Sequence, residues 1–163
     1  MIVVTVGTNE ARFDRLLEAV ATLRVQDDIL VQYGSSSVRP ANAARSLEFL
    51  PFDDLLEEMR RARVVVTHAG IGSIMSALAC GKRPVVVPRL VRYREAVDDH
   101  QLPVARRLES AGLVIVVDDL SRLEEAVIAA GDAVDVAVGP DERLVTELRE
   151  YIAARSGRDG YSR

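Results

Sequence analysis

The chain has 163 residues, of which 48% are hydrophobic, and its formal net charge is -4 at pH 7. This length and composition predict one globular domain with a full hydrophobic core and exclude a disordered chain. The mildly negative charge gives no reason to expect a nucleic-acid partner. The single cysteine, Cys80, excludes a disulfide framework and a cysteine metal site, and it is typical of a protein from the reducing cytosol.

The first apolar run, residues 2–6, is too short for a signal peptide or a membrane span and is interpreted as a strand. After residues 7–9, apolar side chains recur at helical spacing over residues 13–23 and predict an amphipathic helix. Residues 29–33 are the next strand, and the serine-rich residues 34–37 are a loop. The chain therefore begins with a strand, a helix and a second strand.

Residues 64–81 (VVVTHAGIGSIMSALACG) are interpreted as a buried strand, a glycine turn and a helix. The three valines favour a strand buried on both faces of a parallel sheet. Gly70 and Gly72 allow a sharp turn, Ser73 stands at the N-cap or first turn, and Gly81 ends the helix. Free amides at such a helix N-terminus form an anion site, most naturally for phosphate. Because the dinucleotide fingerprint lacks its third glycine here, a turn that simply needs glycines is an equally good interpretation.

The rest of the chain continues the alternation of strands and helices. The further predicted strands are residues 47–50, 84–87 and 113–117, and the further predicted helices are residues 51–59, 102–111 and 121–130. Connections too long for hairpins favour an open parallel sheet with helices on both faces, a Rossmann-like α/β fold. In such sheets ligands bind outside the carboxyl ends of the strands, here the loops at residues 7–9, 34–37, 68–73 and 89–101.

The chain is predicted to divide into an α/β domain at residues 1–130, a linker at 131–140, a helix at 141–155 and a polar, disordered tail at 156–163. The helix carries Leu144, Leu148 and Ile152 on one face. That face either docks on a partner protein or folds back onto the sheet of this chain.

The loop at residues 89–101 carries the densest set of polar groups. Asp99, His100 and Gln101 place an acceptor, a titratable ring and an amide in succession, a grouping suited to reading several hydroxyls of a sugar. Alternatively, Asp99 is a helix cap and the other two side chains are solvated. Arg89, the first of three arginines in the loop, is placed to offset the charge of a pyrophosphate, although loop arginines are usually solvated.

The two histidines of the chain are His68 and His100. His68 follows the buried strand, where it either donates to a phosphate or carbonyl group or is a buried ring satisfied by the backbone. The two histidines lie far apart in sequence and no Asp-x-Asp pattern demands a divalent cation, so no metal site is expected. Nor is there a serine elbow or a cysteine nucleophile with its base.

Four short motifs together resemble the C-terminal, donor-binding half of glycosyltransferase family 28. They are residues 6–9 (VGTN), 68–74 (HAGIGSI), 87–89 (VPR) and 99–101 (DHQ), and the resemblance covers residues 1–130. More closely, the chain is similar to the stand-alone form of this domain. That form is the small subunit of two-subunit transferases, which include the enzyme that adds the second N-acetylglucosamine to dolichol-linked oligosaccharides. The VPR loop looks more like the bacterial exopolysaccharide branch.

The resemblance implies a C-terminal GT-B half that binds a UDP-sugar without a metal or any other cofactor. The uridine diphosphate would lie over His68, Ala69, Gly70, Gly72 and Ser73, with Gly7 and Thr8 nearby. Asp99, His100 and Gln101 would face the sugar, and Phe49, Leu50 and Pro51 are candidates for the uracil pocket. Many relatives grip the ribose with a glutamate where this chain has Ser76, and a serine can make one hydrogen bond where a carboxylate accepts two.

The function implied is that of the donor-binding subunit of an inverting hexosyltransferase. It would move a sugar from a UDP-sugar to a polyprenyl-linked or polysaccharide acceptor in exopolysaccharide biosynthesis. The subunit would be inactive without a membrane-anchored, acceptor-binding partner, and cytoplasmic, held at the inner face of the membrane by that heterodimer. No residue stands out as the catalytic base. The alternative is a non-catalytic module that binds a nucleotide or nucleotide sugar, an interpretation that Ser76 favours.

Overall fold

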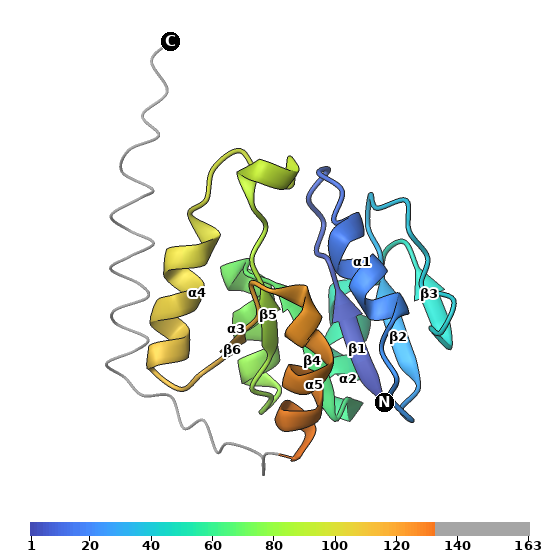
Figure 1. The fold of residues 1–163 in the computed structure, drawn as a ribbon. Coiled ribbons are helices and arrows are strands. Elements are labelled where there is room, and N and C mark those ends of the chain that lie inside the picture. Colours follow the sequence, from blue (N-terminus) through green and yellow to red (C-terminus); the bar gives the residue numbers. More distant parts are fainter. Residues whose placement is uncertain (133–163) are drawn as a thin grey trace.

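The computed structural model describes residues 1–132, and a six-stranded parallel sheet forms its centre (Figure 1). The strands are β1 (Ile2–Thr5), β2 (Ile29–Gln32), β3 (Arg45–Leu47), β4 (Val64–His68), β5 (Val85–Val87) and β6 (Ile115–Val116). Their order across the sheet is β3-β2-β1-β4-β5-β6. The strand order reverses between β1 and β4, and open α/β sheets bind ligands at the carboxyl ends of the strands at such a point.

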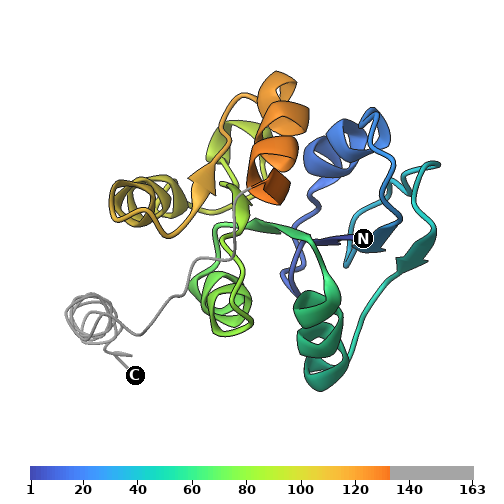
Figure 2. The ribbon, with the colours of Figure 1, turned by 90° about the horizontal axis from the view of Figure 1, so that it is seen from below.

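Helices cover both faces of the sheet. They are α1 (Asp14–Ala21), α2 (Phe52–Arg61), α3 (Ile71–Ala79), α4 (Gln101–Ser110) and α5 (Leu123–Asp132), with short 3₁₀ helices η1 (Val91–Tyr93) and η2 (Leu120–Arg122). Figure 2 shows α1 and α5 on one side of the sheet and α2 and α3 on the other. Two layers of apolar side chains result, one under α1 and α5 and one under α2, α3 and α4.

A row of polar side chains interrupts the apolar layer at the carboxyl end of the sheet. Val3, Leu30 and Val65 pack on the face that α2 and α3 cover. Because side chains alternate along a strand, the residues two positions further lie on the same face. These are Thr5, Gln32 and Thr67, which are register partners across β2, β1 and β4 and are all buried. We call these three residues the polar row.

The predicted open parallel α/β sheet is confirmed, but the third strand is misplaced in the prediction. It was expected at residues 47–50, whereas β3 is Arg45–Leu47. This is an edge strand with two exposed residues, so it lacks the apolar run by which a buried strand is recognised. Phe49 and Leu50 instead lie in the connection from β3 to α2, beyond the carboxyl edge of the sheet.

The predicted linker at residues 131–140 overlaps the end of α5, which continues to Asp132. The rest of that linker, the predicted helix at residues 141–155 and the predicted tail at residues 156–163 lie outside the described residues. Among residues 1–132, no helix is both long enough and apolar enough to span a lipid bilayer.

Candidate functional site

A cavity of about 470 Å³ opens at the carboxyl ends of β1, β2 and β4, on the side of α2 and α3. We call it the carboxyl-edge cavity. Eight predicted site residues line it: Gly7, Thr8, Phe49, Leu50, His68, Gly70, Gly72 and Ser73. Six further residues that were not predicted as contacts also line it: Thr5, Asn9, Gln32, Phe52, Leu55 and Ser76. The cavity therefore brings together loops that are separated by more than sixty positions in the sequence.

The N-terminus of α3 forms one end of the carboxyl-edge cavity. Gly70 is the N-cap residue with φ −75°, and its carbonyl accepts the first helical hydrogen bond from the Ile74 amide at 3.1 Å. The first amides of a helix have no acceptor within it, so the amides of Gly72 and Ser73 can donate to an anion. Ser76 donates its hydroxyl hydrogen to the Gly72 carbonyl at 2.9 Å and keeps only its lone pairs for a ligand.

The ring of His68 packs between Gly7 and Gly70. A Cβ added to Gly7 would lie 2.5 Å from His68 Cε1, and one added to Gly70 would overlap His68 Nε2. Burial and, to a lesser extent, the positive charge of Arg89 lower the pKa of His68 to about 4, although a hydrogen bond to the Thr5 backbone carbonyl acts in the opposite direction. The ring is therefore neutral at pH 7, and it can donate one hydrogen bond without carrying charge.

Gly7 has a second constraint besides the histidine ring. Its φ of +76° lies in the left-handed region that glycine adopts without strain. Its amide does not point to solvent as a free donor, because it donates to Thr5 Oγ1 at 3.2 Å. Thr5 in turn donates to Gln32 Oε1 at 2.5 Å. The turn after β1 is thus tied to the polar row of the sheet.

Aromatic and aliphatic side chains form the opposite end of the cavity. Phe49 and Phe52 are 59% and 61% exposed, an unusual state for phenylalanine, while Leu50 is buried. Exposed aromatic rings at the mouth of a cavity suit the flat face of a heteroaromatic ring. The predicted contact of Phe49 and Leu50 with uracil stays a prediction that this arrangement favours.

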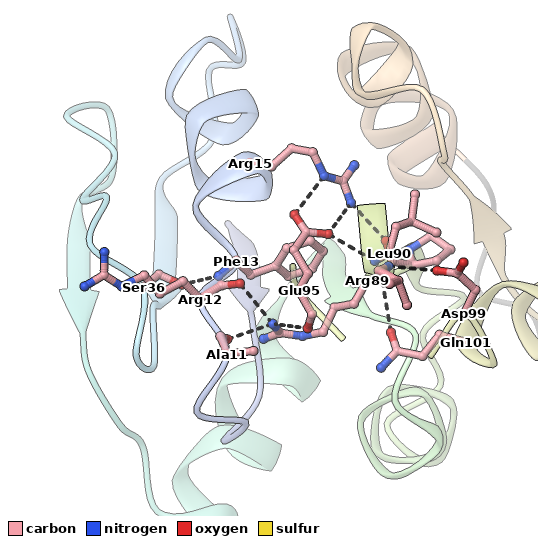
Figure 3. Close-up of polar contacts among 12 residues, drawn as sticks. Ala11, Arg12, Phe13, Arg15, Ser36, Arg89, Leu90, Glu95, Asp99 and Gln101 are labelled. Carbon is pink, nitrogen blue, oxygen red and sulfur yellow. Dashed lines mark hydrogen bonds and ion pairs between the residues drawn. The ribbon is translucent and has the colours of Figure 1, made fainter. Parts of the chain in front are cut away.

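Five predicted site residues lie outside the lining of the carboxyl-edge cavity: Ala69, Arg89, Asp99, His100 and Gln101. Ala69 is buried in the apolar layer between α3 and α4. Arg89 is 1% exposed, and its guanidinium donates to the carbonyls of Val6 and Ala11 at 2.8 Å and to those of Arg12 and Glu95 at longer distances (Figure 3). It joins the β1–α1 connection to the β5–α4 loop, a structural role that the sequence did not indicate.

A buried ion pair anchors the same loop. Glu95 is 3% exposed and accepts two hydrogen bonds of 2.9 Å from Arg15 and one of 3.2 Å from the Leu90 amide. The same pair is visible in Figure 3. Burial lowers the pKa of Arg89, an effect that the Glu95 carboxylate opposes. The loop is therefore tied to α1 by the charge pair of Arg15 and Glu95.

The side chains predicted to meet the sugar also act within the loop. Asp99 Oδ1 accepts from the Val91 amide at 2.8 Å, and Gln101 Oε1 accepts from the Arg89 amide at 3.1 Å. His100 is exposed and pairs with Asp98. The Asp99 side chain therefore closes the loop instead of capping the helix. The contacts of these residues with a sugar stay predictions.

A second cavity of about 400 Å³ lies between α4, β6 and α5. Five of the six charged residues that line it pair with each other, Arg106 with Glu109 and Asp118, and Arg122 with Glu125. None of the glycine turns reaches it. We therefore assign the candidate site to the carboxyl-edge cavity. Within residues 1–132, no group of three or more His, Cys, Asp or Glu side chains is placed to hold a metal ion.

These features define an α/β domain with a candidate ligand cavity at the carboxyl edge of its parallel sheet. The chain belongs to a particular family of such domains, because the model of the glycosyltransferase family 28 C-terminal domain matches residues 1–134. The resemblance drawn from four short motifs is thereby confirmed over the whole of the described domain.

Two curated relatives are transferases of N-acetylglucosamine. A "UDP-N-acetylglucosamine transferase subunit ALG13" of Yarrowia lipolytica is 46% identical over 56 residues, 34% of this chain and 26% of the relative. A "UDP-N-acetylglucosamine--N-acetylmuramyl-(pentapeptide) pyrophosphoryl-undecaprenol N-acetylglucosamine transferase" of Sorangium cellulosum is 31% identical over 114 residues, 70% of this chain and 22% of the relative. The chain thus spans about a quarter of the length of the curated relatives that it matches.

A solved glycosyltransferase shares the fold. The structure of CalG4, the calicheamicin glycosyltransferase, superposes with a TM-score of 0.58 at 19% identity, over 94% of this chain and 43% of CalG4. The domain is therefore one half of the GT-B fold, as predicted.

Proposed function

We propose that this chain is the donor-binding subunit of a two-subunit glycosyltransferase and that its donor is UDP-N-acetylglucosamine. One observation carries the proposal. A single cavity joins the N-terminus of α3, which suits a diphosphate, to the exposed rings of Phe49 and Phe52, which suit a base. The names of both relatives, a UDP-N-acetylglucosamine transferase subunit and an N-acetylglucosamine transferase, support the choice of sugar.

The amides of α3 act on the leaving group. As the sugar departs, negative charge grows on the diphosphate, and preoriented amides at a helix N-terminus stabilise that charge without reorganisation. Among the described residues that line the cavity there is no lysine or arginine. The amides of Gly72 and Ser73 are then the donors that meet the diphosphate.

We propose that transfer needs no divalent cation, since these donors offset the charge of the diphosphate. The test is turnover by the reconstituted enzyme in excess EDTA. Undiminished turnover is expected, and a loss that magnesium restores would contradict the proposal.

We further propose that a membrane-anchored partner supplies the acceptor site and the catalytic base, and holds this subunit at the cytoplasmic face of the membrane. The word "subunit" in the name of the Yarrowia relative supports a partner. An undecaprenol acceptor is part of the name of the Sorangium relative and supports a polyprenyl-linked acceptor here. Neither name mentions exopolysaccharide, so a role in exopolysaccharide biosynthesis rests on the VPR loop alone.

Calorimetric titration of the purified chain tests donor binding directly. UDP and UDP-N-acetylglucosamine are expected to bind, and ADP, whose larger base replaces uracil, is expected to bind more weakly. If neither uridine ligand produces heat or raises the melting temperature, the proposal fails.

The second candidate function is a non-catalytic nucleotide-sugar module. Ser76 favours it, because its single oxygen can accept fewer hydrogen bonds from a ribose than the two oxygens of a carboxylate. The two functions separate when the chain is combined with its partner: a transferase subunit restores turnover, whereas a module binds UDP-N-acetylglucosamine without restoring it.

A further inference from the structure

Gln32 is a buried amide at the floor of the carboxyl-edge cavity. It ends β2, is 2% exposed and belongs to the polar row. Its Oε1 accepts a hydrogen bond of 2.5 Å from Thr5 Oγ1, which itself accepts from the Gly7 amide at 3.2 Å. Three groups thus form a relay that runs from the glycine turn to the amide of Gln32.

The relay determines which way the amide of Gln32 points. A threonine hydroxyl has one hydrogen, and in this relay it goes to Gln32 Oε1 while the Gly7 amide fills a lone pair. If the Gln32 amide were reversed, Nε2 would face Thr5, and the Thr5 hydroxyl hydrogen would have no acceptor there. The Nε2 group is therefore turned away from Thr5, on a side chain that lines the cavity.

The two hydrogens of Gln32 Nε2 meet no acceptor within residues 1–132, since the only side-chain hydrogen bond of Gln32 is the one from Thr5. Nε2 is not fully enclosed, since the fully buried side-chain atoms without a partner in residues 1–132 are Arg83 Nε and Arg89 Nε; it is therefore open to the cavity that the Gln32 side chain lines. A ligand oxygen in the cavity supplies the missing acceptor.

The strand order indicates which part of a ligand reaches Gln32. The connection after β3, the neighbour of β2, carries Phe49 and Leu50. Helix α3 follows β4, which is two strands away from β2 and therefore about 10 Å distant at the usual spacing of strands. Gln32 thus lies beside the apolar end of the cavity and away from the amides that suit phosphate.

We propose that Gln32 Nε2 donates a hydrogen bond to an oxygen of the nucleoside part of the ligand, either a carbonyl of the base or a hydroxyl of the ribose. The proposal rests on the proposed function in taking a nucleoside diphosphate as the ligand. It gives Gln32 a role in specificity, because a neutral donor held in one orientation rejects a ligand that lacks the acceptor.

Substitution of Gln32 by methionine tests the proposal, since Q32M keeps the length of the side chain but removes both donors. The matched control is Q26M, the same change at an exposed glutamine that lies outside the cavity. Calorimetry is expected to show that Q32M binds UDP about three- to tenfold more weakly than wild type, while pyrophosphate affinity is unchanged. T5V, which removes the hydroxyl that orients the amide, is expected to weaken UDP binding in the same direction.

A comparison with 2′-deoxy-UDP distinguishes the two oxygens. If the acceptor is the ribose 2′-hydroxyl, Q32M and wild type bind this analogue equally; if it is the base or the 3′-hydroxyl, the difference persists. Either result supports a contact with the nucleoside.

Equal losses for UDP and pyrophosphate in Q32M would assign Gln32 to the phosphates and overturn the proposal. So would UDP affinity equal to that of wild type in a Q32M variant that unfolds at an undiminished denaturant concentration. These outcomes leave the proposed function standing, because wild type still binds UDP. Failure of wild type to bind any uridine nucleotide would overturn both.

Discussion

At the scale of single residues, the site depends on one histidine ring held between two glycines. Gly7 and Gly70 leave room for His68 because neither has a Cβ, and the ring then lies buried next to the positive charge of Arg89. Both features favour the neutral ring, so the ring carries no charge at neutral pH. Two predictions follow from this packing.

The first concerns the pH dependence of stability. The pKa of His68 falls from 6.5 to about 4 on folding, so the unfolded chain binds the extra proton in the window between these values. Stability from this group is complete above pH 6.5 and is lost as the pH falls towards 4, by about 3 kcal/mol in all. Urea unfolding at pH 7.5 and pH 4 should show that H68Q loses less stability than wild type by roughly that amount.

Equal losses in H68Q and in wild type would contradict a buried neutral ring. The comparison of the two proteins is needed because carboxylates also titrate over this range, and they do so in both.

The second prediction compares two glycines in the turn that leads into α3. Gly70 has a φ of −75° that any residue can adopt, but a Cβ there would overlap the His68 ring. A Cβ on Gly72 would meet no protein atom within 4 Å. G70A should therefore lower both the unfolding free energy and the affinity for UDP, by displacing His68.

G72A should keep or raise stability, because alanine favours a helix by about 1 kcal/mol over glycine, and lose affinity only through contact with the ligand. Denaturation and calorimetry on the two variants measure both quantities. If UDP affinity were unchanged in both variants, the diphosphate could not bind at the N-terminus of α3.

At the scale of elements, the β5–α4 loop is built on buried charges instead of an apolar core. The guanidinium of Arg89 serves four backbone carbonyls and stacks on the ring of Phe13, 4.6 Å from its centroid. Arg15 and Glu95 form a hydrogen-bonded ion pair in the same loop region. Removing one member of such an arrangement leaves polar groups buried without partners, which costs more than the net value of the interaction.

Substitution of Arg89 by lysine should therefore destabilise the domain although it keeps the charge. A lysine has three donors on one nitrogen and cannot reach four carbonyls with the planar geometry of a guanidinium. R89K is expected to lower the unfolding free energy by about 2–3 kcal/mol. The control, R92K at an exposed position of the same loop, should stay within about 0.5 kcal/mol of wild type. A loss for R89K no larger than for R92K would show that the carbonyls find other partners.

At the scale of the whole molecule, the chain supplies one half of a GT-B fold. Its described residues hold a single parallel sheet with one carboxyl edge, and the curated relatives that it matches are about four times longer than the matched part. If the proposed function holds, we expect the acceptor side to come from outside these residues, because a GT-B transferase closes two α/β domains around donor and acceptor.

The purified chain alone is therefore expected to transfer no sugar from UDP-N-acetylglucosamine to a polyprenyl-linked acceptor in detergent. Addition of an acceptor-binding subunit should restore transfer, measured as radiolabelled product lipid. As a control, a Q26M chain, altered outside the cavity, should transfer sugar together with that subunit to the same extent as wild type. Transfer by the chain in the absence of any second protein would overturn the two-subunit proposal.

The sequence determined the fold class and much of the cavity because both follow from local patterns. Valine runs and helical periodicity predict strands and helices, and glycines after β1 and β4 mark the turns at the carboxyl edge, so His68, Gly70 and Ser73 could be assigned to one site. Only the tertiary structure decided the position of β3, since an exposed edge strand has no apolar run.

The tertiary structure also decided where the side chains of Thr5, Gln32 and Arg89 lie. The sequence shows a polar residue at the end of each central strand, a signal that would have pointed to the polar row, but only the register places Thr5 opposite Gln32. Arg89 is indistinguishable from a solvated loop arginine until the carbonyls of a distant connection surround it. Side chains of this kind are specified by partners far away in the sequence, and such partners become neighbours only when the sheet has formed.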